Sequence, residues 1–390
     1  MKVTRLPLFL LASLARCSGA HDVSAQPAVA HPRHPTPPAL DSAVRGLVPI
    51  RGLYVYRFAP QSSKRLNHLI AIADSTEINA FVIDVKDEFG LNYHSADPVV
   101  RKNEGTQVKV PDMQRVVDSI RAHGILPIAR IVVFKDSVTA RMNPGHTIRK
   151  PDGSAWRDKK GLIWVNPYAN AIWEYNYRVA EEAARMGFAE IQFDYIRFPE
   201  PYKSLPPQVF PEANNRTKVQ ALAEFLSGAR LRLDKLGVRT TADVFGLVTT
   251  VGGPLEVGQL WEPIAKSVDV VLPMTYPSHY PHGAFGLPRP NAKPYDVIHI
   301  AVSRARERNE KLGLTGERVR PWLQAFTLGP PRYGPHEIEE EKRAVYDSGY
   351  DGWVLWEPGS RYDPLLPALE KTLVSRKKKP PVPRPPTGLN

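Results

Sequence analysis

Three carboxylates stand near the ends of apolar, strand-like segments. Asp194 ends the alternating run EIQFD, Asp243 lies in TTADVFG, and Glu357 follows WVLW. Two carboxylates beside a bond can cleave it when one donates a proton and the other acts as nucleophile or as base for a water molecule. We therefore expect hydrolysis of a glycosidic bond, with Asp194 as nucleophile or base, Asp243 as general acid and Glu357 as the reserve acid.

Aromatic and polar side chains stand at the ends of the other strand-like segments. Aromatic rings pack on the C–H faces of a sugar ring, while charged and polar groups bind its hydroxyls. Plainer interpretations stay open: a salt bridge between Asp194 and Arg130, a core position for Trp356, and an accessory hydrogen bond for His279. The expected substrate-binding residues are Tyr56, Asp84, Lys86, Arg130, Arg197, Tyr276, His279 and Trp356.

A scaffold must position these residues. Short strand-like segments alternate with amphipathic helix-like segments between the two tails of the chain. Eight strands alternating with eight helices predict an α/β fold, a (β/α)8 TIM barrel. An open, doubly wound sheet is the alternative, but no glycine-rich dinucleotide motif follows the first strand. We expect strands over 52–58, 79–87, 125–134, 188–198, 238–246, 268–276, 318–326 and 350–359, and helices from about 64 and over 113–123, 167–186, 216–236, 260–266, 295–312, 336–348 and 363–374.

The fourth expected strand, 188–198, places its polar residues on one face. Side chains alternate along a strand, so Glu190, Gln192 and Asp194 share the face opposite to Ile191 and Phe193. The apolar face must cover the helices, and the polar face therefore points into the barrel. Asp194 then stands at the barrel mouth, which is where barrel enzymes hold their active sites.

The sequence predicts neither a metal nor another cofactor. No His-x-His cluster stands at a strand end, and the chain has one cysteine, Cys17. Binding of a cation by the loop from Asp84 to Asp87 is an alternative that stays open. A Gly-x-Ser-x-Gly nucleophile motif is absent from the sequence.

The net charge of +12 is concentrated in the tails. Residues 1–40 carry +3 and residues 375–390 carry +5, which leaves +4 for the body. We therefore expect no nucleic-acid partner, and expect the basic tail to be solvated or to contact an anionic cell envelope. No later apolar run is long enough to span a membrane.

The N-terminus has the layout of a secretory signal peptide. Lys2 and Arg5 precede an apolar stretch, and small residues follow at Ala20 and Ala25. A lipoprotein anchor at Cys17 is the alternative. We expect a signal peptide over 1–25, a Pro-rich linker over 26–45, the barrel over 46–375 and a basic Pro-rich tail over 376–390, in a secreted or periplasmic protein.

The segments that carry these residues resemble a known bacterial family. They are RGLYV, NAFVIDVKDEFG, GFAEIQFDYIRFP, TTADVFG, VLPMTYPSHY and DGWVLWEPG, spread over about residues 46–370. The family is described as a putative glycosyl hydrolase domain, formerly a domain of unknown function. The resemblance implies a (β/α)8 barrel related to the α-amylase-like and chitinase-like glycoside hydrolases.

Those two related groups suggest roles. By position, Asp194 is similar to the α-amylase-like nucleophile and Asp243 to the α-amylase-like acid, although that acid is usually Glu. The chitinase-like D-x-D-x-E pattern is not matched, because Gln192 and Ile196 stand where it has carboxylates. Tyr276 and Trp356 resemble residues of the chitinase-like group.

The leading hypothesis is a secreted glycoside hydrolase that acts on an oligo- or polysaccharide. The alternative is a non-catalytic carbohydrate-binding barrel at the cell surface. A third hypothesis, a lyase or deacetylase, is favoured if Asp84 and Lys86 lie centrally in the cleft.

Overall fold

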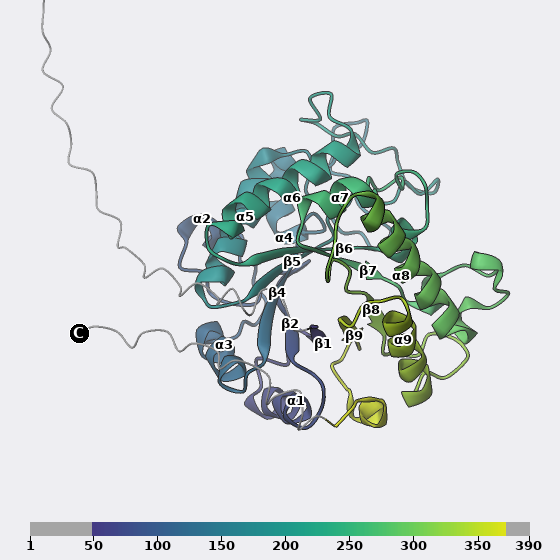
Figure 1. Ribbon diagram of the computed structural model, residues 1–390. Coiled ribbons are helices and arrows are strands. Elements are labelled where there is room, and N and C mark those ends of the chain that lie inside the picture. Colours follow the sequence, from purple (N-terminus) through teal and green to yellow (C-terminus); the bar gives the residue numbers. More distant parts are fainter. Residues whose placement is uncertain (1–48, 372–390) are drawn as a thin grey trace, which may run out of the picture. The chain divides into compact units, whose positions relative to one another are not determined.

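Eight parallel strands close into a barrel in the computed structural model, which describes residues 49–371 (Figure 1). Neighbouring barrel strands follow one another along the chain, and the first pairs with both the second and the last. This confirms the predicted (β/α)8 fold and excludes the open sheet. The strands are β1 (Arg51–Val55), β2 (Ala80–Asp87), β4 (Leu126–Val132), β5 (Glu190–Asp194), β6 (Arg239–Phe245), β7 (Val270–Met274), β8 (Trp322–Gln324) and β9 (Trp353–Trp356), and a short β3 (Gly90–Leu91) runs antiparallel to β2.

Helices surround the barrel (Figure 1). They are α1 (Ser63–Ser75), α2 (Pro98–Arg101), α3 (Met113–Ala122), α4 (Ser137–Met142), α5 (Asn170–Arg185), α6 (Lys218–Asp234), α7 (Trp261–Ser267), α8 (Pro294–Lys311) and α9 (Pro335–Asp347). The prediction of a last α-helix over 363–374 is wrong, because the chain forms a short 3₁₀ helix over Asp363–Ala368 instead. Pro367 inside it has no backbone N–H to continue an α-helix.

Glycines connect five of these helices to the strands that follow. Each adopts a positive φ, between 67° and 92°, which a residue with a side chain rarely tolerates. A left-handed residue directly after a helix ends it and turns the chain back toward the sheet. The five positions are Gly124, Gly187, Gly237, Gly313 and Gly349.

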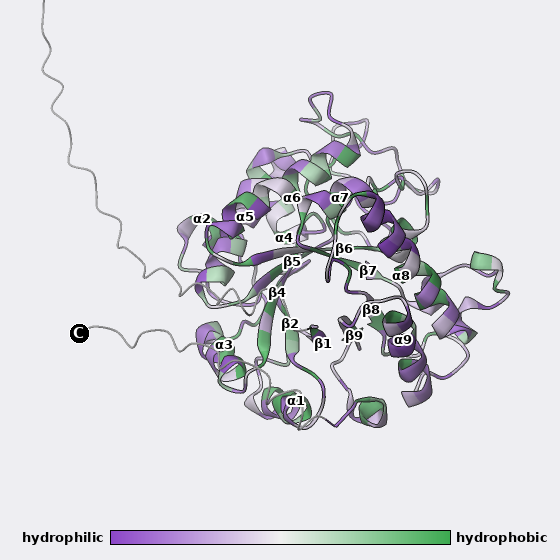
Figure 2. Ribbon diagram, in the orientation of Figure 1, coloured by the Kyte–Doolittle hydropathy of each residue, from purple (hydrophilic) through white to green (hydrophobic). Residues whose placement is uncertain are grey.

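The apolar core has two layers, one inside the barrel and one between strands and helices. Ile191 and Phe193 of β5 pack in the outer layer, while the inner layer includes Tyr54 and Trp322. Figure 2 shows the outer helices with mixed polarity around the more apolar strands. Glu190 is fully buried in the interior and accepts a 2.6 Å hydrogen bond from Arg320.

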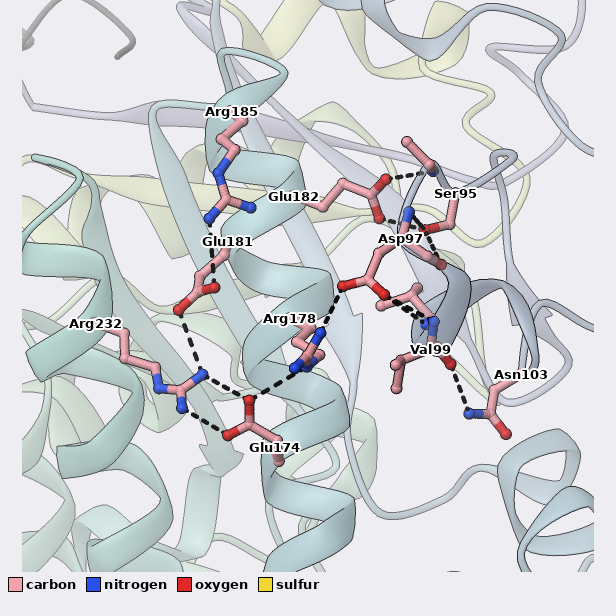
Figure 3. Close-up of polar contacts among 12 residues, drawn as sticks. Ser95, Asp97, Val99, Asn103, Glu174, Arg178, Glu181, Glu182, Arg185 and Arg232 are labelled. Carbon is pink, nitrogen blue, oxygen red and sulfur yellow. Dashed lines mark hydrogen bonds and ion pairs between the residues drawn. The ribbon is translucent and has the colours of Figure 1, made fainter. Parts of the chain in front are cut away.

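Helix α5, which leads into β5, is held by polar contacts on its outer side (Figure 3). Arg178 pairs with Asp97 at the start of α2, at 3.0 Å. Arg232 of α6 reaches Glu174 at 2.6 Å. Exposed pairs of this kind contribute about 0–1 kcal/mol each, so they align α5 with its neighbours more than they stabilise the fold.

The predicted signal peptide (1–25), the linker (26–45) and the basic tail (376–390) lie outside the described residues. Within residues 49–371, the helices are too short or too polar to cross a membrane.

Candidate functional site

A cavity of about 660 Å³ lies at the C-terminal ends of the barrel strands. Its wall includes the last residues of four strands, Asp194 of β5, Phe245 of β6, Met274 of β7 and Trp356 of β9. Parallel strands bring their carboxyl ends to one face of a barrel, so residues distant in the sequence meet there. The cavity therefore lies where the sequence predicts the chemistry.

Asp194 faces this cavity and is fixed at both carboxylate oxygens. Arg130 donates to its Oδ2 through Nε at 3.0 Å and also through Nη2. The backbone N–H of Tyr195 donates to Oδ1 at 2.5 Å. Tyr195 adopts a left-handed φ of 51°, a conformation that costs free energy in a residue with a side chain. The salt bridge expected as an alternative thus exists, and it holds Asp194 on the cavity wall.

Arg130 also binds a second carboxylate below the cavity. Its Nη1 donates to Asp84 Oδ1 at 2.5 Å, and Tyr54 donates its hydroxyl to Asp84 Oδ2 at 2.5 Å. Burial raises the pKa of Asp84, and the charge of Arg130 opposes that rise. Asp84 is 3% exposed and does not line the cavity. Asp84 therefore contacts Arg130 and lies outside the cavity wall, and its role as a substrate contact stays a prediction.

Asp243 lies beside Asp194 but beneath the cavity surface. The register of β5 and β6 pairs Phe193 with Ala242, so the two aspartates are neighbours. Asp243 accepts hydrogen bonds from Gln192 Nε2 at 2.8 and 3.0 Å and from Trp322 Nε1 at 2.7 Å.

The environment of Asp243 favours its neutral form. Burial raises its pKa well above the ordinary value, and the negative charge of Asp194 raises it further. With 1% of Asp243 exposed and no place on the cavity wall, this carboxyl group has no direct path to a substrate. The structure brings the predicted pair together and exposes only one member of it to the cavity.

The carboxylate of Glu357, the reserve acid, stabilises the turn that follows β9. Its Oε2 accepts the backbone N–H groups of Gly359 at 2.8 Å and Arg361 at 2.7 Å. Glu357 is not part of the cavity wall. Its proximity in sequence to Trp356 therefore does not bring it to the site, because the carboxylate folds back onto its own loop.

Two further predicted substrate contacts point elsewhere. A register shift between Asp84 and Lys86 breaks the alternation of β2, and Lys86 is fully buried against Asp136 at the start of α4, at 2.8 Å. Tyr56 accepts a hydrogen bond from Arg65 of α1 at 3.0 Å and is absent from the cavity wall. Neither residue is placed to bind substrate, and the condition that favoured a lyase or deacetylase is not met.

Aromatic rings form one wall of the cavity. Tyr276 and Trp356 are stacked, with centroids 5.2 Å apart and planes at 26°. Phe326 packs edge-on against both of these rings. The ring centroid of His279 lies 5.2 Å from that of Tyr276. Burial lowers the pKa of His279, which favours its neutral imidazole. Tyr276, His279 and Trp356 thus line the cavity, as their sequence positions predict.

Arg197 lines the cavity on the side that follows β5. Its guanidinium group lies over Trp164, Tyr195 and Phe245, with distances of 5.1, 5.1 and 4.8 Å to the ring centroids. Its Nη1 is 3.0 Å from Glu200 Oε2. Arg197 is therefore held in a fixed plane by rings and by one carboxylate.

The sequence analysis missed several wall residues, most of which lie on loops beyond the strand ends. No periodicity marks such positions, although the segment after β5 offers a signal in Glu200 and Tyr202, which follow Arg197 closely. The missed residues are Tyr195, Glu200, Tyr202, Phe245, Gly246, Leu247, Gln259, Met274, Tyr280 and Trp322.

No metal centre is evident in the described part of the chain. Within residues 49–371, no three His, Cys, Asp or Glu side chains are grouped to hold a metal ion. The two aspartates of the loop considered for a cation bind arginines instead, since Asp84 pairs with Arg130 and Asp87 with Arg57.

Two solved structures share the fold. The glycoside hydrolase domain of PgaB (BpsB) from Bordetella bronchiseptica aligns with a TM-score of 0.59 at 14% identity, over 83% of this chain and 98% of that one. The chitobiase of Flavobacterium johnsoniae aligns with a TM-score of 0.52 at 12% identity, over 82% of this chain and 47% of that one. A hypothetical protein from Ruminiclostridium thermocellum is 36% identical over 49% of this chain and 97% of its own, with a TM-score of 0.45.

Sequence comparison identifies the family. No curated protein sequence matches the chain. The family model described as "Putative glycosyl hydrolase domain" matches residues 52–362, which include the whole cavity wall and all of the barrel strands except the first residue of β1. The chain therefore belongs to this glycosyl hydrolase domain family.

Proposed function

We propose that the protein is a glycoside hydrolase that cleaves a polysaccharide, with Asp194 as the carboxylate that reacts at the anomeric carbon. The observation that carries this proposal is the placement of Asp194, a buried carboxylate on the wall of a 660 Å³ cavity, between Arg130 and the N–H of Tyr195. An arginine and a backbone N–H favour the ionised form of a carboxylate. A nucleophile, or a base that activates water, must be ionised in this way.

The aromatic wall supports a sugar as the ligand. The stacked pair of Tyr276 and Trp356 offers an apolar surface for the C–H face of a pyranose. Neutral His279 and the hydroxyl groups of the wall tyrosines offer hydrogen bonds for sugar hydroxyls. Family membership and the barrel fold shared with the PgaB glycoside hydrolase domain are consistent with this substrate class.

The proposal includes export. The signal-like segment 1–25 would direct the protein out of the cytoplasm, and the basic tail 376–390 would contact an anionic envelope surface. A polysaccharide of the cell envelope or its surroundings is then the accessible substrate.

The release of reducing ends from a panel of polysaccharides tests the activity. We expect turnover by the full chain on at least one glycan, and a loss of about 10³-fold or more in Asp194→Asn. Glu339→Gln is the matched control and should retain full activity, because Glu339 is an exposed carboxylate of α9 that is not part of the cavity wall. Equal activity of Asp194→Asn and the wild type would contradict the proposal.

One observation favours a second candidate, a non-catalytic carbohydrate-binding barrel. The predicted acid, Asp243, is shielded from the cavity. Binding of a glycan by the wild type, measured by pull-down, without any release of reducing ends would support this second candidate.

A further inference from the structure

The cavity wall contains a second carboxylate, and it is neither Asp243 nor Glu357. Among the residues that line this cavity, Asp194 and Glu200 carry the two carboxylates. We propose that Glu200 is the proton-transferring catalytic residue that works with Asp194. This inference rests on the proposed glycoside hydrolase function and supplies the acid that the fold does not provide through Asp243.

The backbone before Glu200 is firmly anchored. Phe198 is fully buried between Tyr168 and Phe210, with ring centroids at 4.9 and 5.1 Å. Its N–H donates to Val257 O at 2.9 Å. The position of Glu200, two residues later, is therefore set by core packing even though it lies on a loop.

The backbone at Glu200 is also held by hydrogen bonds. Its carbonyl oxygen accepts from the N–H of Tyr202 at 3.0 Å and from Gln208 Nε2 at 3.3 Å. The Glu200 side chain keeps 34% of its surface exposed. A fixed backbone with an open carboxylate suits a group that must meet a substrate oxygen and exchange its proton with water.

Arg197 supplies the electrostatic partner for this proton transfer. Its Nη1 lies 3.0 Å from Glu200 Oε2, and its own position is set by three aromatic rings. An adjacent guanidinium stabilises the ionised carboxylate, which is the form that Glu200 takes after it has released its proton.

The proposed step balances in protons and electrons. Protonated Glu200 donates its proton to the glycosidic oxygen while the bond from that oxygen to the anomeric carbon breaks, and the bonding electron pair stays on the oxygen. The anomeric carbon forms a new bond either to a carboxylate oxygen of Asp194 or to a water molecule that Asp194 deprotonates. In the first case, water later adds to the carbon, gives its proton to Glu200 and releases Asp194.

The dependence of the rate on the leaving group separates proton donation from a structural role. We expect Glu200→Gln to lose about 10²–10⁴-fold in activity on the polysaccharide. The kcat/KM of the same variant should stay within about tenfold of the wild type on the dinitrophenyl glycoside of the released sugar. Dinitrophenolate departs without a proton, and kcat/KM includes only the steps up to that departure. Asp194→Asn should lose activity on both substrates, and Glu339→Gln on neither.

Each other result overturns the assignment. Full activity of Glu200→Gln on the polysaccharide would remove Glu200 from catalysis and leave the hydrolase intact. An equal loss of kcat/KM on both substrates would show that Glu200 is not the proton donor. Absence of wild-type turnover on every glycan would reject the glycoside hydrolase function itself, and Glu200 with it. Thermal unfolding of Glu200→Gln should match that of the wild type, because the side chain is a third exposed.

Discussion

Asp194 and Asp243 are neighbours on adjacent strands, yet they occupy different environments. Asp194 lines the cavity and binds Arg130, whereas Asp243 lies below it under Gln192 and Trp322. The depth of a side chain inside the barrel decides this difference, since both residues point inward from their strands. The carboxylate of Asp194 is therefore open to the cavity, whereas the carboxylate of Asp243 contacts other side chains of the protein.

Arg130→Met should destabilise the fold by about 3–5 kcal/mol, because Arg130 is the shared partner of Asp84 and Asp194 and its loss leaves both carboxylates buried without a cation. Urea unfolding measures the change. Adding Asp84→Asn should recover part of the stability but none of the glycan cleavage, because Asp194 still lacks its arginine. A double variant no more stable than Arg130→Met would contradict this account.

Asp243→Ala should cost about 1–3 kcal/mol for each donor left unpaired, Gln192 and Trp322 Nε1. Asp243→Asn should lose less stability than Asp243→Ala. Gln192 Oε1 has no partner, and rotation of the Gln192 amide would let this oxygen accept a hydrogen bond from the new asparagine. Urea unfolding of the two variants at neutral pH gives the comparison.

The stability of Asp243→Asn relative to the wild type should rise with pH. Burial raises the pKa of Asp243 in the folded state, so the folded protein keeps a proton that the unfolded chain releases near its ordinary pKa of ~3.9. The wild type therefore loses stability as pH rises from that value toward the raised pKa, and the variant lacks this loss. The test is the difference in unfolding free energy between the two proteins, measured at pH 5 and again at pH 8. If this difference is the same at both pH values, the pKa of Asp243 is not raised in the folded state.

Lys86→Met should destabilise the protein by about 3–5 kcal/mol, because it leaves Asp136 buried without its ammonium partner. Glycan cleavage per folded molecule should stay unchanged, since Lys86 lies on the helix side of β2. Activity normalised to the folded fraction is the readout. A specific rise in KM would restore Lys86 to the substrate site.

Trp356→Ala should weaken glycan binding by about tenfold, which corresponds to ~1.4 kcal/mol of lost stacking on the sugar face. Removal of the ring also takes away one packing partner of both Tyr276 and Phe326. Titration calorimetry of the catalytically inactive Asp194→Asn protein, with and without the tryptophan, isolates binding from turnover. Equal affinities would show that Trp356 is a packing residue.

Much of the scaffold follows from local patterns in the sequence. Apolar runs of the right length predict the eight strands, and glycines such as Gly187 predict where helices end, because both depend on nearby residues. The alternation of β5 likewise places Asp194 at the barrel mouth. A strand has a period of two, so its inward face can be read from the residue types alone.

Tertiary structure decided which polar side chains reach the cavity. The register shift in β2 turned Lys86 toward α4, the turn after β9 occupied Glu357, and packing above Asp243 covered it. Glu200 entered the wall through a loop anchored by Phe198. Such outcomes depend on contacts between residues far apart in the chain, and residue type and spacing within one segment do not encode them.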